Sequence, residues 1–204
     1  MWYLLGKINR ILYSQGFING LQSLASMKFV VTGGAGFIGS HIVEYLVKRG
    51  DSVTVIDNLN TGKKENLQKV LNKINFVEGD IRDYDLLQDL VKNTDGIFHE
   101  AALASVQESF SKTEEYSDVN VNGTENIFKL AKIVDAKVVY ASSSSVYGNP
   151  KILPIKEDAE LNPINPYAQT KLEDEYLAKK YVVKGAKIIG LRYFNVFGER
   201  QSKE

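Results

Sequence analysis

Residues 28–39 read KFVVTGGAGFIG, a short apolar run followed at once by regularly spaced glycines. The Phe and Val residues predict a buried strand, and SHIVEYLVKR (40–49) continues with apolar residues at helical spacing. Both a GxGxxG and a GxxGxxG spacing are satisfied, by Gly33, Gly34, Gly36 and Gly39. A strand, a glycine-rich turn and a helix in this order predict a loop that receives the pyrophosphate of a dinucleotide.

The start of this predicted helix supplies the groups that bind phosphate. Phe37 and Ile38 lie in the first turn, where N–H groups have no partner within the helix. The positive end of the helix dipole also favours an anion at this point. A strand-to-helix turn without a ligand stays open as the alternative.

A carboxylate follows at the distance that a dinucleotide site requires. The apolar run SVTVID (52–57) ends in Asp57, close to the roughly 20-residue interval expected for a carboxylate that accepts from the adenosine ribose. Because a carboxylate repels a 2′-phosphate, Asp57 favours NAD over NADP. Lys63 and Lys64 leave NADP open, and Asp57 could also be a turn residue before Asn58.

From Met27 onward, short apolar runs alternate with longer helical ones. We expect strands at 28–32, 52–57, 75–80, 96–101, 137–142 and 187–192. We expect helices at 37–49, 62–72, 83–93, 115–134 and 166–184. Val- and Ile-rich runs without polar alternation indicate a parallel sheet that is covered on both faces. The pattern predicts an α/β fold, a doubly wound, Rossmann-like parallel sheet with ligands at the carboxyl ends of its strands.

Composition excludes several classes of protein. Lys plus Arg and Asp plus Glu both total 25, which removes the basic surface expected of a nucleic-acid binder. The chain has no Cys, so it has neither disulfides nor a thiolate nucleophile. Its two histidines, His41 and His99, lie far apart in the sequence, so we expect no metal site. We expect a cytoplasmic protein.

The first 26 residues differ from the rest. They predict a short amphipathic helix, with apolar and basic residues at helical spacing: Leu5, Lys7, Ile8, Arg10 and Leu12. This stretch is too short and too interrupted to span a bilayer, and we expect no membrane association. We expect an N-terminal extension over 1–26 and one dinucleotide-binding domain over 27–204.

A tyrosine and a lysine lie four residues apart in the predicted helix 166–184. The YxxxK spacing occurs four times in the chain, but only Tyr167, with Lys171, follows a proline suited to the first helical turn, Pro166. A nearby ammonium lowers the pKa of a tyrosine, so that its phenolate can take a proton from a hydroxyl whose carbon loses a hydride. A serine run at 142–145 offers a third polar group at a strand end. A solvated helix face and a plain turn stay open as alternatives.

From Met27 to about Gly198 the chain resembles the extended short-chain dehydrogenase/reductases, and most of all the nucleotide-sugar 4-epimerases of the UDP-glucose or UDP-glucuronate type. The resemblance is carried by VTGGAGFIGS, IDNLNTG, EGDIRD, FHEAALASVQES, NVNGT, YASSSSVYG, NPYAQTK and LRYFNVFG.

The resemblance implies NAD as cofactor and a UDP-sugar or related nucleotide sugar as substrate. It assigns catalysis to Ser143, Tyr167 and Lys171, which also contact the cofactor, and it assigns sugar contacts to Ser105 and Asn195 as well as to Ser143 and Tyr167. It assigns further cofactor contacts to Gly33, Gly36, Phe37, Ile38, Gly39, Asp57, Asn58, Asp80, Ile81, Ala101, Ala102, Asn120 and Phe194.

In the implied reaction, Tyr167 takes the proton of the sugar C4 hydroxyl while NAD takes the hydride. The 4-keto sugar turns over, and the hydride returns to its opposite face. Ser144 and Ser145 stand where related dehydratases carry Asp-Glu, which favours epimerisation over water elimination.

Family members continue beyond RYFNVFG into a region that closes over the nucleotide sugar, so we expect the C-terminal substrate domain to be largely missing here. A truncated NAD-binding module without activity, and a nucleotide-sugar dehydratase or reductase, stay open as alternatives. The resemblance also implies a homodimer that packs through the helices at 115–134 and 166–184, although contact with the sheet equally explains their apolar residues.

Overall fold

The computed structural model describes residues 26–202, so the predicted amphipathic helix near the N-terminus lies outside the described residues. Within this range six parallel strands form one sheet, in the order β3-β2-β1-β4-β5-β6. They are β1 (Lys28–Thr32), β2 (Ser52–Asp57), β3 (Asn75–Glu78), β4 (Gly96–His99), β5 (Lys137–Ser143) and β6 (Lys187–Tyr193). The predicted doubly wound α/β fold is confirmed, and the strand order reverses between β1 and β4, where such folds bind ligands.

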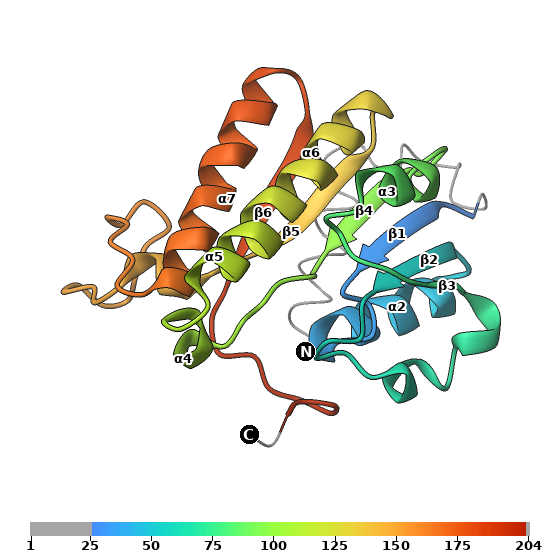
Figure 1. The fold of residues 1–204 in the computed structure, drawn as a ribbon, viewed down its shortest axis with the longest axis horizontal. Helices are drawn as coiled ribbons and strands as arrows, with labels where there is room; N and C mark the ends of the chain where they lie inside the picture. The colour runs from blue at the N-terminus through green and yellow to red at the C-terminus, as the bar shows by residue number, and fades with distance from the viewer. Residues whose placement is uncertain (1–25, 203–204) are drawn as a thin grey trace.

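Helices cover both faces of the sheet (Figure 1). Helix α2 (Phe37–Arg49) packs on one face, while α3 (Tyr84–Leu90), α6 (Gly123–Ile133) and α7 (Pro166–Val183) pack on the other. Strand residues alternate between them: Val31 and Phe98 join the core under α2, and Val30 and Ile97 join the core under the other helices. Because helices cover both faces of the sheet, the strands do not alternate between apolar and polar residues.

The helix predicted at 62–72 is wrong. Two short 3₁₀ turns are observed instead, η1 (Lys64–Leu67) and η2 (Leu71–Lys73). The two buried side chains of the segment, Leu67 and Val70, lie three positions apart, which suits three residues per turn better than 3.6. Asn66 also ties the segment to the glycine loop, because its Nδ2 donates to the carbonyl oxygen of Ala35 at 2.8 Å.

The helix predicted at 115–134 is observed as three consecutive segments. They are α5 (Thr113–Tyr116), the π-helical turn η3 (Ser117–Asn122) and α6. A short helix that was not predicted, α4 (Val106–Ser109), precedes them. The helix predicted at 166–184 is confirmed as α7, with Pro166 in its first turn.

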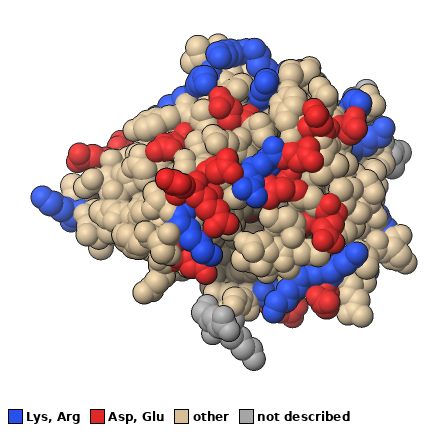
Figure 2. Space-filling view, in the orientation of Figure 1, with Lys and Arg blue, Asp and Glu red and all other residues tan. Residues whose placement is uncertain are grey.

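After β6 the chain folds back towards α2. Arg200 Nη1 lies 2.7 Å from Glu44 Oε1 on α2 and donates to the carbonyl oxygen of Asn66 at 2.8 Å. Figure 2 shows acidic and basic side chains interspersed over one face of the molecule. Among residues 26–202, no helix combines the length and the apolar character needed to cross a bilayer.

Candidate active site

The glycine loop after β1 has a shape that side chains would block. Gly33 has a φ of +64°, and a Cβ there would lie 2.6 Å from the backbone nitrogen of Ala101. A Cβ on Gly39, in the first turn of α2, would collide with the carbonyl oxygen of Gly33. Glycine is therefore required at both ends of the loop, because helix, loop and strand ends pack backbone to backbone.

The loop leads directly into the first turn of α2. Ser40 N donates to the carbonyl oxygen of Gly36 at 3.1 Å and opens the helical ladder. The N–H groups of Phe37, Ile38 and Gly39 precede it, so the helix itself offers them no acceptor. The first turn carries no acidic residue, which leaves the helix start suited to an anion.

One cleft runs along the carboxyl ends of β1, β2 and β4. Its lining includes eight of the residues that the resemblance assigns to the cofactor: Gly33, Gly36, Asp57, Asn58, Asp80, Ile81, Ala101 and Ala102. Segments that are far apart in the sequence thus meet at one edge of the sheet, as the fold requires. Gly62, Glu100 and Val119 also line the cleft and were not predicted.

Asp57 lies buried at the end of β2, and the backbone fixes both of its oxygens. Oδ2 accepts from Ala35 N at 2.9 Å, and Oδ1 accepts from Leu59 N at 2.8 Å. Each oxygen keeps acceptor capacity for a ligand hydroxyl. A Cβ on Gly62 would lie 2.7 Å from Oδ1, so the glycine leaves space beside the carboxylate. A ribose with a free 2′-hydroxyl fits this environment.

Asp80 and Ile81 follow β3 at the same cleft. Asp80 accepts from Arg82 Nη2 at 2.8 Å and from Asn58 Nδ2 at 3.1 Å. These hydrogen bonds, with Arg82 first, lower the pKa of Asp80 to about 2 despite partial burial. Ile81 packs against Gly123, where a Cβ would lie 2.5 Å from the isoleucine Cδ1. The pair gives the cleft a charged and an apolar wall.

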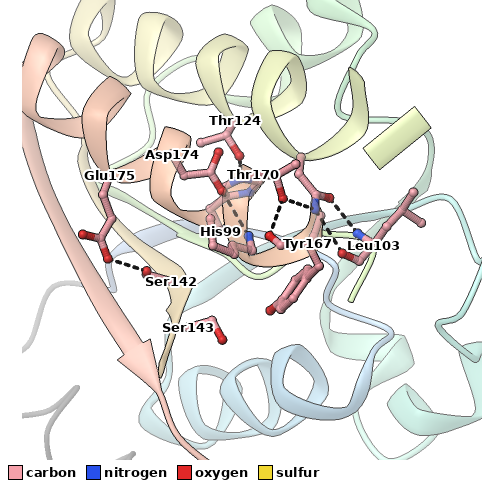
Figure 3. Close-up of polar contacts among 12 residues, drawn as sticks. His99, Leu103, Thr124, Ser142, Ser143, Tyr167, Thr170, Asp174 and Glu175 are labelled. Carbon is pink, nitrogen blue, oxygen red and sulfur yellow. Dashed lines mark hydrogen bonds and ion pairs between the residues drawn. The ribbon is translucent and has the colours of Figure 1, made fainter. Parts of the chain in front are cut away.

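Asn120 does not line this cleft but lies fully buried behind it, on η3. Its Oδ1 accepts from Leu103 N at 2.8 Å, and its Nδ2 donates to Leu103 O at 3.0 Å and to Thr170 Oγ1 at 3.0 Å (Figure 3). Asn120 therefore holds the loop after β4 against α7.

The predicted catalytic residues come from β5 and α7. Ser143 ends β5, and its Oγ accepts from Ser145 N at 3.1 Å and from Ser145 Oγ at 2.8 Å. The Ser143 hydroxyl proton therefore stays available to a ligand oxygen. Tyr167 lies in the first turn of α7, and Figure 3 shows its phenol directed towards the side of the site where Ser143 lies. Lys171 is buried one turn further along α7.

Two ionisable groups that the sequence analysis missed lie at the end of β4. His99 is buried between Thr32 Oγ1 at 2.7 Å and Thr124 Oγ1 at 2.8 Å, and burial together with the charge of Lys171 lowers its pKa to about 3. Glu100 accepts from the hydroxyl of Tyr193 at 3.1 Å. Burial raises the pKa of Glu100 to about 8, against the opposing effects of Tyr193 and Lys171. Burial thus favours the uncharged form of both groups.

A third ionisable residue that was not predicted, Glu175, contacts the serine run at Ser142. Glu175 Oε1 accepts from Ser142 Oγ at 2.7 Å and from Arg192 Nε at 2.8 Å, which links β5, α7 and β6. Arg192 Nη1 also donates to the hydroxyl of Tyr147 at 2.7 Å. No sequence spacing signals these contacts, because the partners lie on different elements.

Three predicted ligand contacts lie away from the cleft. Phe194 and Asn195 line a second cavity between α7 and β6, together with Tyr147. Ser105 is exposed and caps α4, where its side chain accepts from Glu108 N at 3.3 Å. The described residues alone do not bring these three side chains to the glycine loop.

A family model described as the NAD dependent epimerase/dehydratase family matches residues 29–204. The chain belongs to this family, and the resemblance seen in the motifs is confirmed. The UDP-glucose 4-epimerase of Lactobacillus helveticus is 42% identical over 176 residues, which cover 84% of this chain and 52% of that protein.

Solved structures agree with this membership. The UDP-N-acetylglucosamine 4-epimerase from Methanobrevibacter ruminantium M1, in complex with UDP-N-acetylmuramic acid, matches with a TM-score of 0.83 and 40% identity, over 88% of this chain and 58% of that one. The dTDP-glucose 4,6-dehydratase from Streptomyces venezuelae, with NAD bound, matches with a TM-score of 0.82 and 34% identity, over 86% and 58%. This chain spans about half the length of the relatives it matches.

Proposed function

We propose that this chain carries the cofactor site and the catalytic residues of an NAD-dependent nucleotide-sugar 4-epimerase. One observation carries the proposal. The glycine loop with Asp57, and the group of Ser143, Tyr167 and Lys171, lie at the carboxyl edge of the same parallel sheet. A dinucleotide with its phosphates at α2 can extend along this edge towards the catalytic group.

The cleft fits NAD. Gly33, Gly36 and Gly39 allow the backbone to approach a pyrophosphate, which would receive the N–H groups of Phe37 and Ile38. Asp57 would accept from the adenosine ribose and disfavour NADP by repelling its 2′-phosphate. Asn58, Asp80, Ile81, Ala101 and Ala102 would complete the contacts along the cleft, with Asn120 holding its wall. When bound, NAD supplies the group that accepts a hydride and returns it.

The chain's own residues handle the proton of the sugar hydroxyl. The phenolate of Tyr167 takes the C4 hydroxyl proton and later gives it back, which is general base and general acid catalysis by one group. The ammonium of Lys171 stabilises that phenolate. Ser143, whose hydroxyl proton is free, donates to the same sugar oxygen and orients it.

The substrate is proposed to be a UDP-sugar, because the similar epimerases bear names of this class. Ser105, Phe194 and Asn195 stay proposed ligand contacts. The similar dehydratase from Streptomyces venezuelae keeps elimination as the second candidate. Ser144 and Ser145 argue against it, since neither hydroxyl is the acid or base that loss of water requires.

A homodimer is also part of the proposal. Helices α6 and α7 expose apolar side chains: Ile133, Tyr176 and Val183 are 64%, 54% and 88% exposed. Apolar side chains this exposed are those that a contact between subunits would cover.

The assay incubates the chain with NAD and, in turn, UDP-glucose, UDP-glucuronate and their N-acetyl relatives. Interconversion of C4 epimers without net NADH would support the epimerase. Accumulating NADH would indicate a dehydrogenase, a 4-keto-6-deoxy product would indicate a dehydratase, and no turnover despite bound NAD would indicate a non-catalytic module.

Replacing Tyr167 by Phe is expected to lower turnover about 100-fold or more while NAD stays bound. The matched control is Tyr176→Phe, since Tyr176 opens the other YxxxK spacing on α7 and is exposed. Rates and NAD binding are measured for both variants. Full activity of Tyr167→Phe would remove this tyrosine from the mechanism.

A further inference from the structure

The ammonium of Lys171 is buried together with the carboxylate of Asp174. Lys171 Nζ lies 3.1 Å from Asp174 Oδ2, and their side chains are 4% and 0% exposed. Both residues belong to α7, three positions apart, so they share a helix face. Nothing in the family motifs quoted above assigns a role to Asp174.

Several other polar groups face this pair, and none replaces Asp174 as the partner of the lysine charge. Burial favours the uncharged forms of His99 on β4 and of Glu100 beyond its end, and the effect of Glu100 on Lys171 is the smallest one. Thr124 on α6 presents an uncharged hydroxyl, and Glu173 on α7 bonds outward to Gln169 at 3.0 Å. Tyr167 remains, and its phenolate is the group whose charge the lysine must support.

Burial alone would drive a proton off this lysine. Burial is the largest effect and opposes the charged form of Lys171. The neighbouring acidic groups together outweigh it, with the charge of Asp174 first, then Tyr167, the hydrogen bond to Asp174 and finally Glu100, so the pKa of Lys171 lies above its ordinary value. Burial raises the pKa of Asp174, and the charge and hydrogen bond of Lys171 oppose that rise, so each partner favours the charged form of the other. The lysine is therefore charged because the carboxylate lies beside it.

The contact also orients the ammonium. A lysine ammonium has three N–H donors, and Asp174 fixes one of them from the buried side of α7. Two donors stay free for groups in the site. Asp174 itself does not line the cleft, and the hydroxyl of Thr124 on α6 lies beside its carboxylate.

We propose that Asp174 is a positioning residue that keeps the Lys171 ammonium charged and aimed at Tyr167. The inference rests on the proposed role of Lys171 in catalysis. Asp174 touches neither sugar nor cofactor and acts through the lysine. Without this carboxylate, Lys171 releases its proton at lower pH, and the phenolate of Tyr167 loses the charge that stabilises it.

The test measures the ionisation of Lys171 directly in the whole chain by NMR, with ¹³Cε-labelled lysine. Lys171→Arg assigns its signal. Asp174→Asn is expected to lower the pKa of Lys171 by about one unit or more, a tenfold change in proton affinity. Glu173→Gln, which removes a carboxylate one position away, is the matched control and should leave the Lys171 signal unshifted.

An unshifted Lys171 signal in folded Asp174→Asn would overturn the proposal. Should that variant fail to fold, the double variant Lys171→Met/Asp174→Leu is the second measurement, because it removes both charges. Recovery of folding in the double variant supports the pairing, and failure of both variants contradicts it.

This signal requires neither NAD nor turnover, so the two hypotheses can fail separately. A chain that shows the Lys171 shift but neither binds NAD nor epimerises sugars would reject the proposed function alone. A chain that binds NAD but shows no shift would reject the role of Asp174 alone. Where turnover is measurable, the alkaline limb of the pH–rate profile should move to lower pH in Asp174→Asn.

Discussion

Gly33 needs glycine for two reasons, its positive φ and its close contact with Ala101, and comparison with Gly50 separates their effects. Its φ is +64°, and its missing side chain leaves room for Ala101. Gly50 also has a positive φ, +94°, but a Cβ there would meet nothing within 4 Å.

We expect Gly50→Ala to lower the free energy of unfolding by about 1 kcal/mol through backbone strain alone. Gly33→Ala should cost at least about twice as much and also weaken NAD binding, because the loop must shift. Urea denaturation and calorimetry with NAD check this pair. Equal effects of the two substitutions would contradict the close packing of the loop.

The raised pKa of Glu100 makes the free energy of unfolding depend on pH near neutrality. Its pKa is raised from 4.5 to about 8, so between these values the folded chain holds a proton that the unfolded chain has lost, and stability falls as pH rises. His99, lowered from 6.5 to about 3, has the opposite effect between those values. From pH 6.5 to 8, His99 therefore does not offset the effect of Glu100 on the free energy of unfolding.

In this window we expect the free energy of unfolding to decrease by up to about 1.4 kcal/mol per pH unit. Glu100→Gln should flatten the slope, since the amide does not ionise. Glu78→Gln, at an exposed carboxyl on the end of β3, is the control and should leave the slope unchanged. Denaturation curves at several pH values measure the slopes, and an identical slope in Glu100→Gln would refute the assignment.

Single residues could be predicted where a motif fixes their neighbours. The glycine spacing and Asp57 predicted a cleft whose lining includes Gly33, Gly36 and Asp57. His99, Glu100 and Asp174 escaped prediction, because their roles depend on burial and on partners that other elements supply.

At the scale of elements, α7 shows how local chemistry fixes the start of a catalytic helix. Asn165 caps the helix, with Oδ1 accepting from Ala168 N at 2.8 Å, and Pro166 occupies the first turn. Tyr167 follows directly, so its position depends on this cap.

Asn165→Ala is expected to cost about 1 kcal/mol of stability and to lower turnover, because the first turn frays. Asn165→Asp keeps an acceptor for the same N–H and should restore both. Thermal unfolding and the epimerase assay provide the measurements. Unchanged stability in Asn165→Ala would show that the cap is dispensable.

Elements with continuous apolar periodicity were predicted well, and those shaped by local contacts were not. The predicted ends of α2 agree with the observed ones, because buried residues recur at helical spacing along the whole helix. Segment 62–72 failed because its contacts with the glycine loop outweigh helical propensity. The π-helical turn η3 carries no sequence signal, and its buried Asn120 has meaning only beside Leu103.

At the scale of the whole molecule, one edge of the sheet gathers the functional groups. The parallel order β3-β2-β1-β4-β5-β6 brings the carboxyl ends of all six described strands to one side. Sequence alone predicted the fold and this edge, since both follow from the alternation of strands and helices. It could not place Phe194 and Asn195, which follow the edge strand β6 and line the cavity beside α7.

We propose that a dinucleotide lies across the start of α2 with its adenosine ribose at Asp57. Isothermal titration calorimetry of the purified chain with NAD, and separately with NADP, measures this binding. We expect one NAD per chain and weaker binding of NADP, because the Asp57 carboxylate repels a 2′-phosphate. Absence of NAD binding by the folded chain, or tighter binding of NADP, would refute this placement of the dinucleotide.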